Sequence, residues 1–105
     1  MNKKTLLIAA LASTLTLGTG SATALDGAKL YQTKTCVACH GKDAKTPIMP
    51  AYPKLAGQSA AYAAQQMRDI KSGARANGMS AAMKGVMHMV SDEEIQAIAD
   101  WLATL

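Results

Sequence analysis

Apolar residues recur at helical spacing in three stretches of this 105-residue chain. The first stretch, residues 26–35, predicts a short helix with Asp26 as its N-cap. Leu30 and Tyr31 are its large inward-facing side chains. The pattern therefore places a helix close to the start of the folded part of the chain.

The second stretch, residues 59–72, predicts a helix that begins at Ser59 and ends at Gly73. Its apolar face is formed at i, i+4 and i+7 by Ala63, Met67 and Ile70. The third stretch gives the clearest signal, because Ser91 and Glu94 form the N-cap and N3 positions of a capping box. Its inward-facing positions are Ile95, Ile98, Leu102 and Leu105.

The segments between these helices lack the same regularity. Residues 36–57 contain Pro47, Pro50 and Pro53, which forbid a regular helix there. Residues 74–90 hold four of the seven methionines: Met79, Met83, Met87 and Met89. No stretch alternates like a strand, so we expect an all-α domain of three to five short helices with long loops.

The N-terminus has the pattern of a secretory signal peptide. Lys3 and Lys4 precede an apolar stretch from Leu6 to Leu17, and the sequence Ala-Thr-Ala at 22–24 is a typical cleavage site. A membrane anchor is the alternative, but the apolar stretch is short for a span, which needs about 20 residues. We therefore expect cleavage of residues 1–24, a mature domain over residues 25–105, and a periplasmic location.

Composition and charge exclude several classes of function. The charge of +4 includes Lys3 and Lys4, and the predicted mature chain has 9 basic and 7 acidic residues, a net charge of +2. Such a chain has no basic stripe and no stacking platform for nucleic acid. Aromatic residues make up only 4% of the chain, so rings cannot fill its core. A domain this small is marginal without another stabilising group.

The sequence Cys36-Val37-Ala38-Cys39-His40 predicts that group. Two thiols at this spacing can each add across a vinyl group of haem, and the next residue then lies close to the iron as its proximal ligand. Two alternatives remain at this point. Cys36 and Cys39 could form a thioredoxin-like dithiol, or they could bind zinc together with His40 and His88.

The whole predicted mature chain resembles the class I c-type cytochromes, especially short bacterial mono-haem proteins and single halves of di-haem ones. The resemblance lies in the haem motif and in four further segments: Gly27–Tyr31, Pro53–Gly57, Lys71–Asn77 and Trp101. It implies one covalently bound haem c. It also implies that the Pro53 carbonyl accepts the proton of the His40 ring, that Leu55 packs on the haem, and that Gly27, Tyr31 and Trp101 lie where the first and last helices cross.

The second axial ligand should be a methionine. In the resembled family it comes from the segment before the last helix, where Met83 lies eight residues ahead of Ser91. Thioether ligation would raise the reduction potential. The alternatives are Met79, Met87, Met89 and His88.

Charged residues suggest how the haem and its partners are contacted. Arg75 is a candidate to pair with haem propionates because its donors form a fork, and Lys71 and Lys84 are weaker candidates. Five lysines surround the motif in sequence and could steer acidic partners: Lys29, Lys34, Lys42, Lys45 and Lys54.

The expected function is electron transfer by a monomeric, non-enzymatic cytochrome c between redox proteins such as membrane-bound reductases or oxidases. We expect no catalytic residues and no small-molecule substrate. The alternatives are the haem subunit of a larger dehydrogenase and a ligand-binding or peroxidase-like haem protein.

Overall fold

Helices and loops, with no strand, make up residues 24–105, the part of the chain that the computed structural model describes. The helices are α1 (Gly27–Thr33), α2 (Cys36–His40), α3 (Ala60–Ser72), α4 (Ser80–Met87) and α5 (Asp92–Ala103). The all-α prediction is confirmed. The predicted signal peptide falls on residues 1–23, outside the described part, and on Ala24. None of the helices in residues 24–105 has the length and apolar character needed to cross a membrane.

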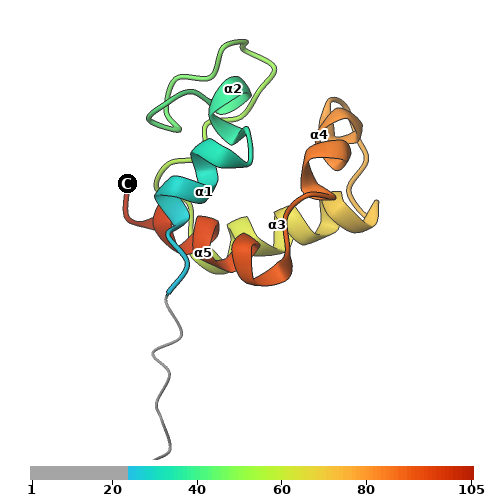
Figure 1. Ribbon diagram of the computed structural model, residues 1–105. Coiled ribbons are helices and arrows are strands. Elements are labelled where there is room, and N and C mark those ends of the chain that lie inside the picture. The colour runs from blue at the N-terminus through green and yellow to red at the C-terminus, as the bar shows by residue number, and fades with distance from the viewer. Residues whose placement is uncertain (1–23) are drawn as a thin grey trace, which may run out of the picture.

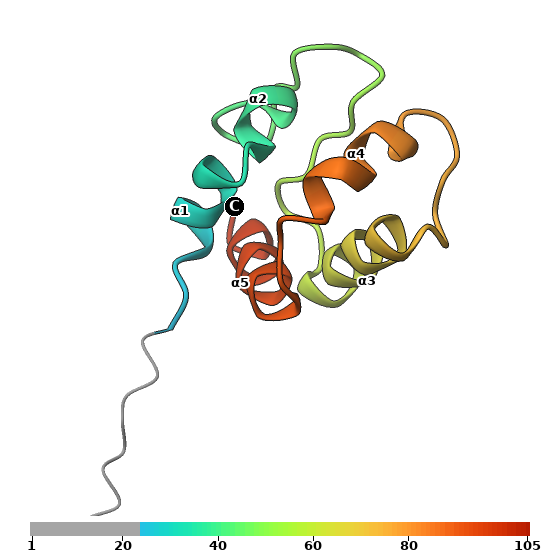
Figure 2. The same ribbon diagram turned by 45° about the vertical axis from the view of Figure 1, so that its right-hand side comes forward.

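Helices α1, α3 and α5 form a platform, and α2 and α4 are two arms that extend from it. Helices α3 and α5 pack together, and α1 crosses α5 (Figures 1 and 2). Helix α2 continues from α1, whereas α4 packs on α3. Figure 2 shows α2 and α4 on opposite sides of the space above the platform, with the long loop after α2 running between them.

The three predicted helices begin where the sequence indicates. The carboxylate of Asp26 accepts the Lys29 amide at 3.1 Å, and the Ser59 hydroxyl accepts the Tyr62 amide at 3.3 Å. At the start of α5 the capping box is complete, because Ser91 and Glu94 each accept the backbone N–H of the other. These bonds satisfy N–H groups that have no partner inside a helix.

Two short helices, α2 and α4, lie outside the three predicted stretches. Neither has a side-chain cap: Thr35 precedes α2 with φ of 67°, and Met79 precedes α4. Helices of five and eight residues are too short to be stable alone, so tertiary contacts must hold them.

The inward assignment of Leu105 is wrong. Helix α5 ends at Ala103, and the Leu105 side chain is 39% exposed. Near the end of α5 the Leu102 carbonyl accepts the backbone N–H of Gly57, which belongs to the loop between α2 and α3. The other three inward-facing residues of α5 are buried: Ile95, Ile98 and Leu102.

The crossing of α1 and α5 depends on a residue without a side chain. A Cβ atom on Gly27 would collide with the Ala97 carbonyl oxygen and lie 2.8 Å from the Trp101 Cβ. One turn further along α1, the Tyr31 ring lies 5.0 Å from the Trp101 ring, centroid to centroid. Close backbone approach and ring contact together fix the crossing.

We therefore expect Gly27→Ala to lower the free energy of unfolding of the haem-loaded protein by about 2–3 kcal/mol, because backbone atoms must move to admit the methyl group. Urea titration followed by circular dichroism measures this. Gly85→Ala in α4 is the matched control, because its new methyl group meets no atom within 4 Å. Equal effects of the two substitutions would contradict the crossing argument.

Candidate haem site

A cavity of about 520 Å³ lies between the platform and its two arms. Its floor includes apolar side chains of α3 and α5: Met67, Ile70, Ile98 and Leu102. Helices α2 and α4 and the loop between α2 and α3 supply the walls. Its volume and mainly apolar lining are typical of a site for a small molecule or cofactor.

Helix α2 delivers the whole predicted attachment motif to one wall. Cys36, Cys39 and His40 all line the cavity, and both cysteines are free and half-buried. Burial raises the pKa of the Cys36 thiol. Gly41 then turns the chain with φ of 84°, where a Cβ would collide with the Thr46 carbonyl oxygen. The glycine thus lets the chain leave α2 sharply while His40 stays at the cavity.

The His40 ring is held in one orientation. It is 6% exposed, and its Nδ1 lies 2.9 Å from the Pro53 carbonyl oxygen. A carbonyl can only accept, so Nδ1 carries the proton and Nε2 keeps its lone pair for a metal. Burial lowers the pKa of His40, and the bond to Pro53 partly opposes that shift. A buried, neutral, oriented imidazole is what an axial ligand requires.

Backbone hydrogen bonds fix the segment that carries Pro53. The Ala44 carbonyl accepts the amides of Leu55 at 2.9 Å and Ala56 at 3.1 Å. The Gly57 amide donates to Leu102 in α5 at 2.9 Å. These bonds place the Pro53 carbonyl on the His40 ring and bring the half-buried Leu55 to the cavity.

The predicted distal candidates do not all reach the cavity. Met79, the residue before α4, and Met83, inside α4, both line the cavity. Met87 is 1% exposed and belongs to the protein core, and Met89 is 57% exposed. Met87, Met89 and His88 are not among the residues that line the cavity. Of the predicted candidates for the distal ligand, only Met79 and Met83 therefore line the cavity. Met67 also lines it, from α3 on the floor.

Arg75 reaches the cavity, and the two lysines considered with it do not. Its Nη1 donates to the Gln66 side-chain oxygen at 3.1 Å, and its backbone N–H donates to the Asp69 carbonyl. Lys71 instead donates to the Val90 carbonyl, and Lys84 extends over Gly73 at the end of α3. Of these three residues Arg75 is thus the one placed to meet a carboxylate at the cavity, which Lys54 also lines from the loop after α2.

Three residues have positioning roles that the sequence analysis does not assign to them. The Tyr31 hydroxyl donates to the Gly41 carbonyl and ties α1 to the end of α2. Ala44, with φ of 56°, accepts two loop amides, and Gln66 orients Arg75. Tyr31 has a sequence signal, as an aromatic on the inner face of the first helix. Ala44 and Gln66 have none, because their roles depend on the path of the loop.

Two structural observations bear on the alternatives for the cysteine motif. Within residues 24–105 no group of three or more His, Cys, Asp or Glu side chains is arranged to hold a metal ion. His88 lies away from the cavity. A thioredoxin-like dithiol needs a βαβ setting, and the described segment is purely helical.

A comparison with known sequences decides which of the three uses of the cysteine motif applies: haem attachment, zinc binding or a dithiol. The sequence profile of cytochrome c matches residues 24–105. The chain belongs to the cytochrome c family. A cytochrome c binds haem covalently, and this one is an electron-transfer cytochrome with a single attachment motif.

Individual relatives agree. Cytochrome c-553 of Nitratidesulfovibrio vulgaris is 32% identical over 103 residues, 98% of this chain and 99% of that protein. Cytochrome c4 of Pseudomonas aeruginosa is 43% identical over 93 residues, 86% of this chain and 44% of that protein. The thiosulfate dehydrogenase electron acceptor of Stutzerimonas stutzeri is 38% identical over 88 residues, 84% of this chain and 40% of that protein. This cytochrome thus spans one relative fully and less than half of the other two.

The residues at the cavity fit haem c. Two thiols and an oriented imidazole lie on one wall, thioethers lie on the α4 side, and an apolar floor lies below. Haem c supplies an iron that changes between the ferrous and ferric states, one electron at a time. The residues at the cavity would supply the ligands and mainly apolar surroundings for this group.

The buried Tyr31 makes the stability of this cytochrome depend on alkaline pH. Burial, the main cause, raises the pKa of Tyr31 from 10.0 to about 12. The unfolded chain therefore loses this proton first as pH rises, and stability should fall between pH 10 and pH 12. Tyr31→Phe should remove this part of the pH dependence and cost about 1 kcal/mol below pH 10.

Urea unfolding of both proteins from pH 8 to pH 12 measures the difference. Other alkaline transitions are common to both proteins and cancel. A constant difference across that range would contradict the assignment.

Proposed function

We propose that Cys36 and Cys39 form the two thioether bonds to haem c, that His40 is the proximal iron ligand, and that Met83 is the distal one. The observation that carries this proposal is the meeting of α2 and α4 at one cavity, with the His40 ring fixed by the Pro53 carbonyl. Six-coordinate iron suits electron transfer because neither oxidation state has to rearrange its ligands. A thioether opposite histidine also raises the reduction potential.

Met83 is a better distal ligand than Met79 for two reasons. Met83 lies inside α4 and is half-buried, so its backbone is fixed by the helix and its side chain is partly shielded from water. Met79 precedes the helix and is 47% exposed. A ligand held by a helix loses less conformational entropy when it binds the iron.

Three further residues are proposed to surround the haem. Pro53 orients His40 through its carbonyl, and Leu55 packs against the haem from the same loop. Arg75, oriented by Gln66, pairs with a propionate. All three line the cavity.

The mature protein is proposed to be residues 25–105, a cytochrome c domain released into the periplasm after cleavage of residues 1–24. The pattern of Lys3, Lys4 and the apolar stretch that follows supports export. Covalent attachment agrees with it, because exported cysteines would otherwise tend to oxidise. The protein is proposed to act as a monomer.

Its proposed role is to carry single electrons between redox proteins such as membrane-bound reductases or oxidases. It acts on no small molecule, because both axial positions of the iron are filled by protein side chains. A dehydrogenase is a second candidate partner, as a donor or as an assembly with this chain as its haem subunit. Two relatives named thiosulfate dehydrogenase electron acceptor favour that candidate.

The distal ligand is tested by Met83→Leu, with Met79→Leu as the matched control. The oxidised wild-type protein should show the weak long-wavelength absorption band of thioether-ligated haem, and its reduced form should not bind carbon monoxide. Met83→Leu should lose the band, bind carbon monoxide and have a lower potential. Retention of the band in Met83→Leu with its loss in Met79→Leu would reverse the assignment.

The attachment is tested by Cys36→Ala and Cys39→Ala. Each should leave one haem vinyl group unreacted and shift the pyridine haemochrome spectrum of the exported protein toward that of free haem. The double variant should release haem into acidified organic solvent. A wild-type spectrum showing two unreacted vinyl groups would refute the proposed attachment.

A further inference from the structure

Helix α4, which carries Met83, has little support from other helices. Among the helices of residues 24–105, α3 is the only one that packs against it. Its C-terminal end leads into a four-residue linker, His88–Ser91, before α5 begins. Within this region Met87 and Val90 are each 1% exposed, whereas Met89 is 57% exposed. The position of α4 therefore depends on how firmly the linker is held.

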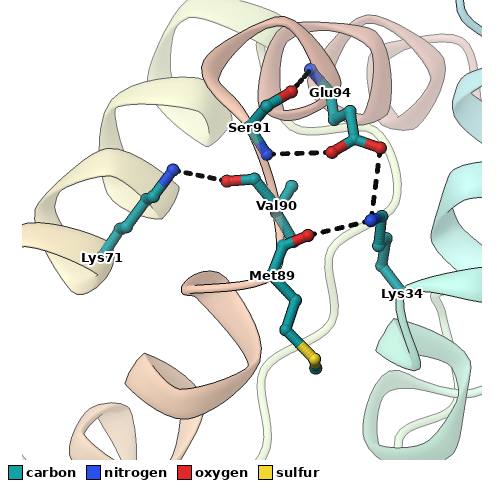
Figure 3. A network of polar contacts seen from close by, with 6 residues as sticks. All are labelled: Lys34, Lys71, Met89, Val90, Ser91 and Glu94. Atoms are coloured by element: carbon teal, nitrogen blue, oxygen red, sulfur yellow. Dashed lines mark hydrogen bonds and ion pairs between the residues drawn. The ribbon is translucent and has the colours of Figure 1, made fainter.

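Two lysines hold the linker from two different helices (Figure 3). Lys34, at the C-terminal end of α1, donates to the Met89 carbonyl at 2.9 Å. Lys71, in the last turn of α3, donates to the next carbonyl, that of Val90. Both lysines are half-buried, but the bond from Lys71 is partly buried, whereas the bond from Lys34 is exposed to solvent. We call this pair of contacts the linker clamp.

The capping box of α5 extends the clamp. The Lys34 Nζ lies 3.4 Å from one carboxylate oxygen of Glu94. The other Glu94 oxygen accepts the Ser91 amide at 3.0 Å. Figure 3 shows these contacts on one side of the linker, with the Lys71 contact on the other. The linker is thus tied to α1, α3 and α5 through three consecutive residues.

We propose that Lys71 and Lys34 are positioning residues for the distal ligand: by clamping the linker they keep α4, and with it Met83, at the iron. This inference rests on the proposed ligation by Met83. A hydrogen bond from a charged donor is stronger than one between neutral groups, and its loss would also leave the Val90 carbonyl, at a buried residue, without this donor. Removing the Lys71 contact should therefore favour a state in which α4 has moved away from the cavity.

The test measures how easily Met83 is displaced. Imidazole is added to the oxidised haem-loaded protein, and loss of the thioether absorption band is followed. Lys71→Met keeps most of the side-chain stem but removes the donor, and it should raise the apparent affinity for imidazole about tenfold. Lys34→Met should have a smaller effect because Lys34 is the more peripheral contact. Lys71→Arg retains a donor and should restore most of the wild-type affinity.

Lys29→Met is the control, because Lys29 is an exposed lysine on α1. It should leave the imidazole affinity unchanged. Hydrogen exchange at the amides of residues 88–90 provides a second readout and should be faster in Lys71→Met than in Lys29→Met. If Lys71→Met does not fold, Lys71→Gln, whose side chain is shorter and uncharged, tests the contact to Val90, and Lys34→Met tests the contact to Met89.

The outcomes separate this inference from the function on which it rests. Wild-type protein without the thioether band would refute ligation by Met83, and the positioning role would fall with it. A normal wild-type band, with imidazole affinity and exchange unchanged in the Lys71 and Lys34 variants, would refute the clamp alone. An imidazole affinity that rises in the Lys71 and Lys34 variants but not in Lys29→Met would support the clamp. A general loss of stability would not be sufficient, because unrelated destabilising substitutions also cause it.

Discussion

The central constraint on the structure is a mainly apolar cavity between helices that do not contact one another across it. Among the described helices α2 packs only on α1, and α4 packs only on α3. The two arms therefore have no helix-to-helix contact across the space between them, and bound haem must supply the missing apolar contact. This explains how a chain with only 4% aromatic residues builds a core, because one large planar group replaces several rings. Folding of the arms and binding of haem should be closely coupled.

The platform provides the rigid part of the design. Gly27 allows α1 to approach α5, the rings of Tyr31 and Trp101 pack at the crossing, and the Tyr31 hydroxyl reaches the Gly41 carbonyl just after His40. The same helix that anchors the domain thus fixes the end of the attachment motif. On the other side, the bond from Gly57 to Leu102 ties the Pro53 loop to α5. The bond from Tyr31 to Gly41 and the bond from Gly57 to Leu102 therefore both tie the surroundings of His40 to the platform.

The sequence was sufficient where information is local and insufficient where it is tertiary. The N-caps Asp26, Ser59 and Ser91 determine three helix starts through hydrogen bonds within four residues. Helices α2 and α4 lack such caps, and their stability comes from contacts that no local pattern reveals. The evenly spaced methionines illustrate the same limit: Met83 and Met87 share a stripe, yet only burial shows that Met87 belongs to the protein core.

The lysines show why counting charges in a sequence is not enough to describe docking. Five lysines lie near the motif in sequence, but Lys34 is engaged by the Met89 carbonyl and Glu94 rather than directed outward. Lys42, Lys45 and Lys54 remain exposed on the loop after α2, whereas Asp92 and Glu93 are exposed at the start of α5. Figures 1 and 2 show that loop and that helix start at opposite ends of the domain. With a predicted net charge of only +2, orientation toward a partner would come from this asymmetry rather than from total charge.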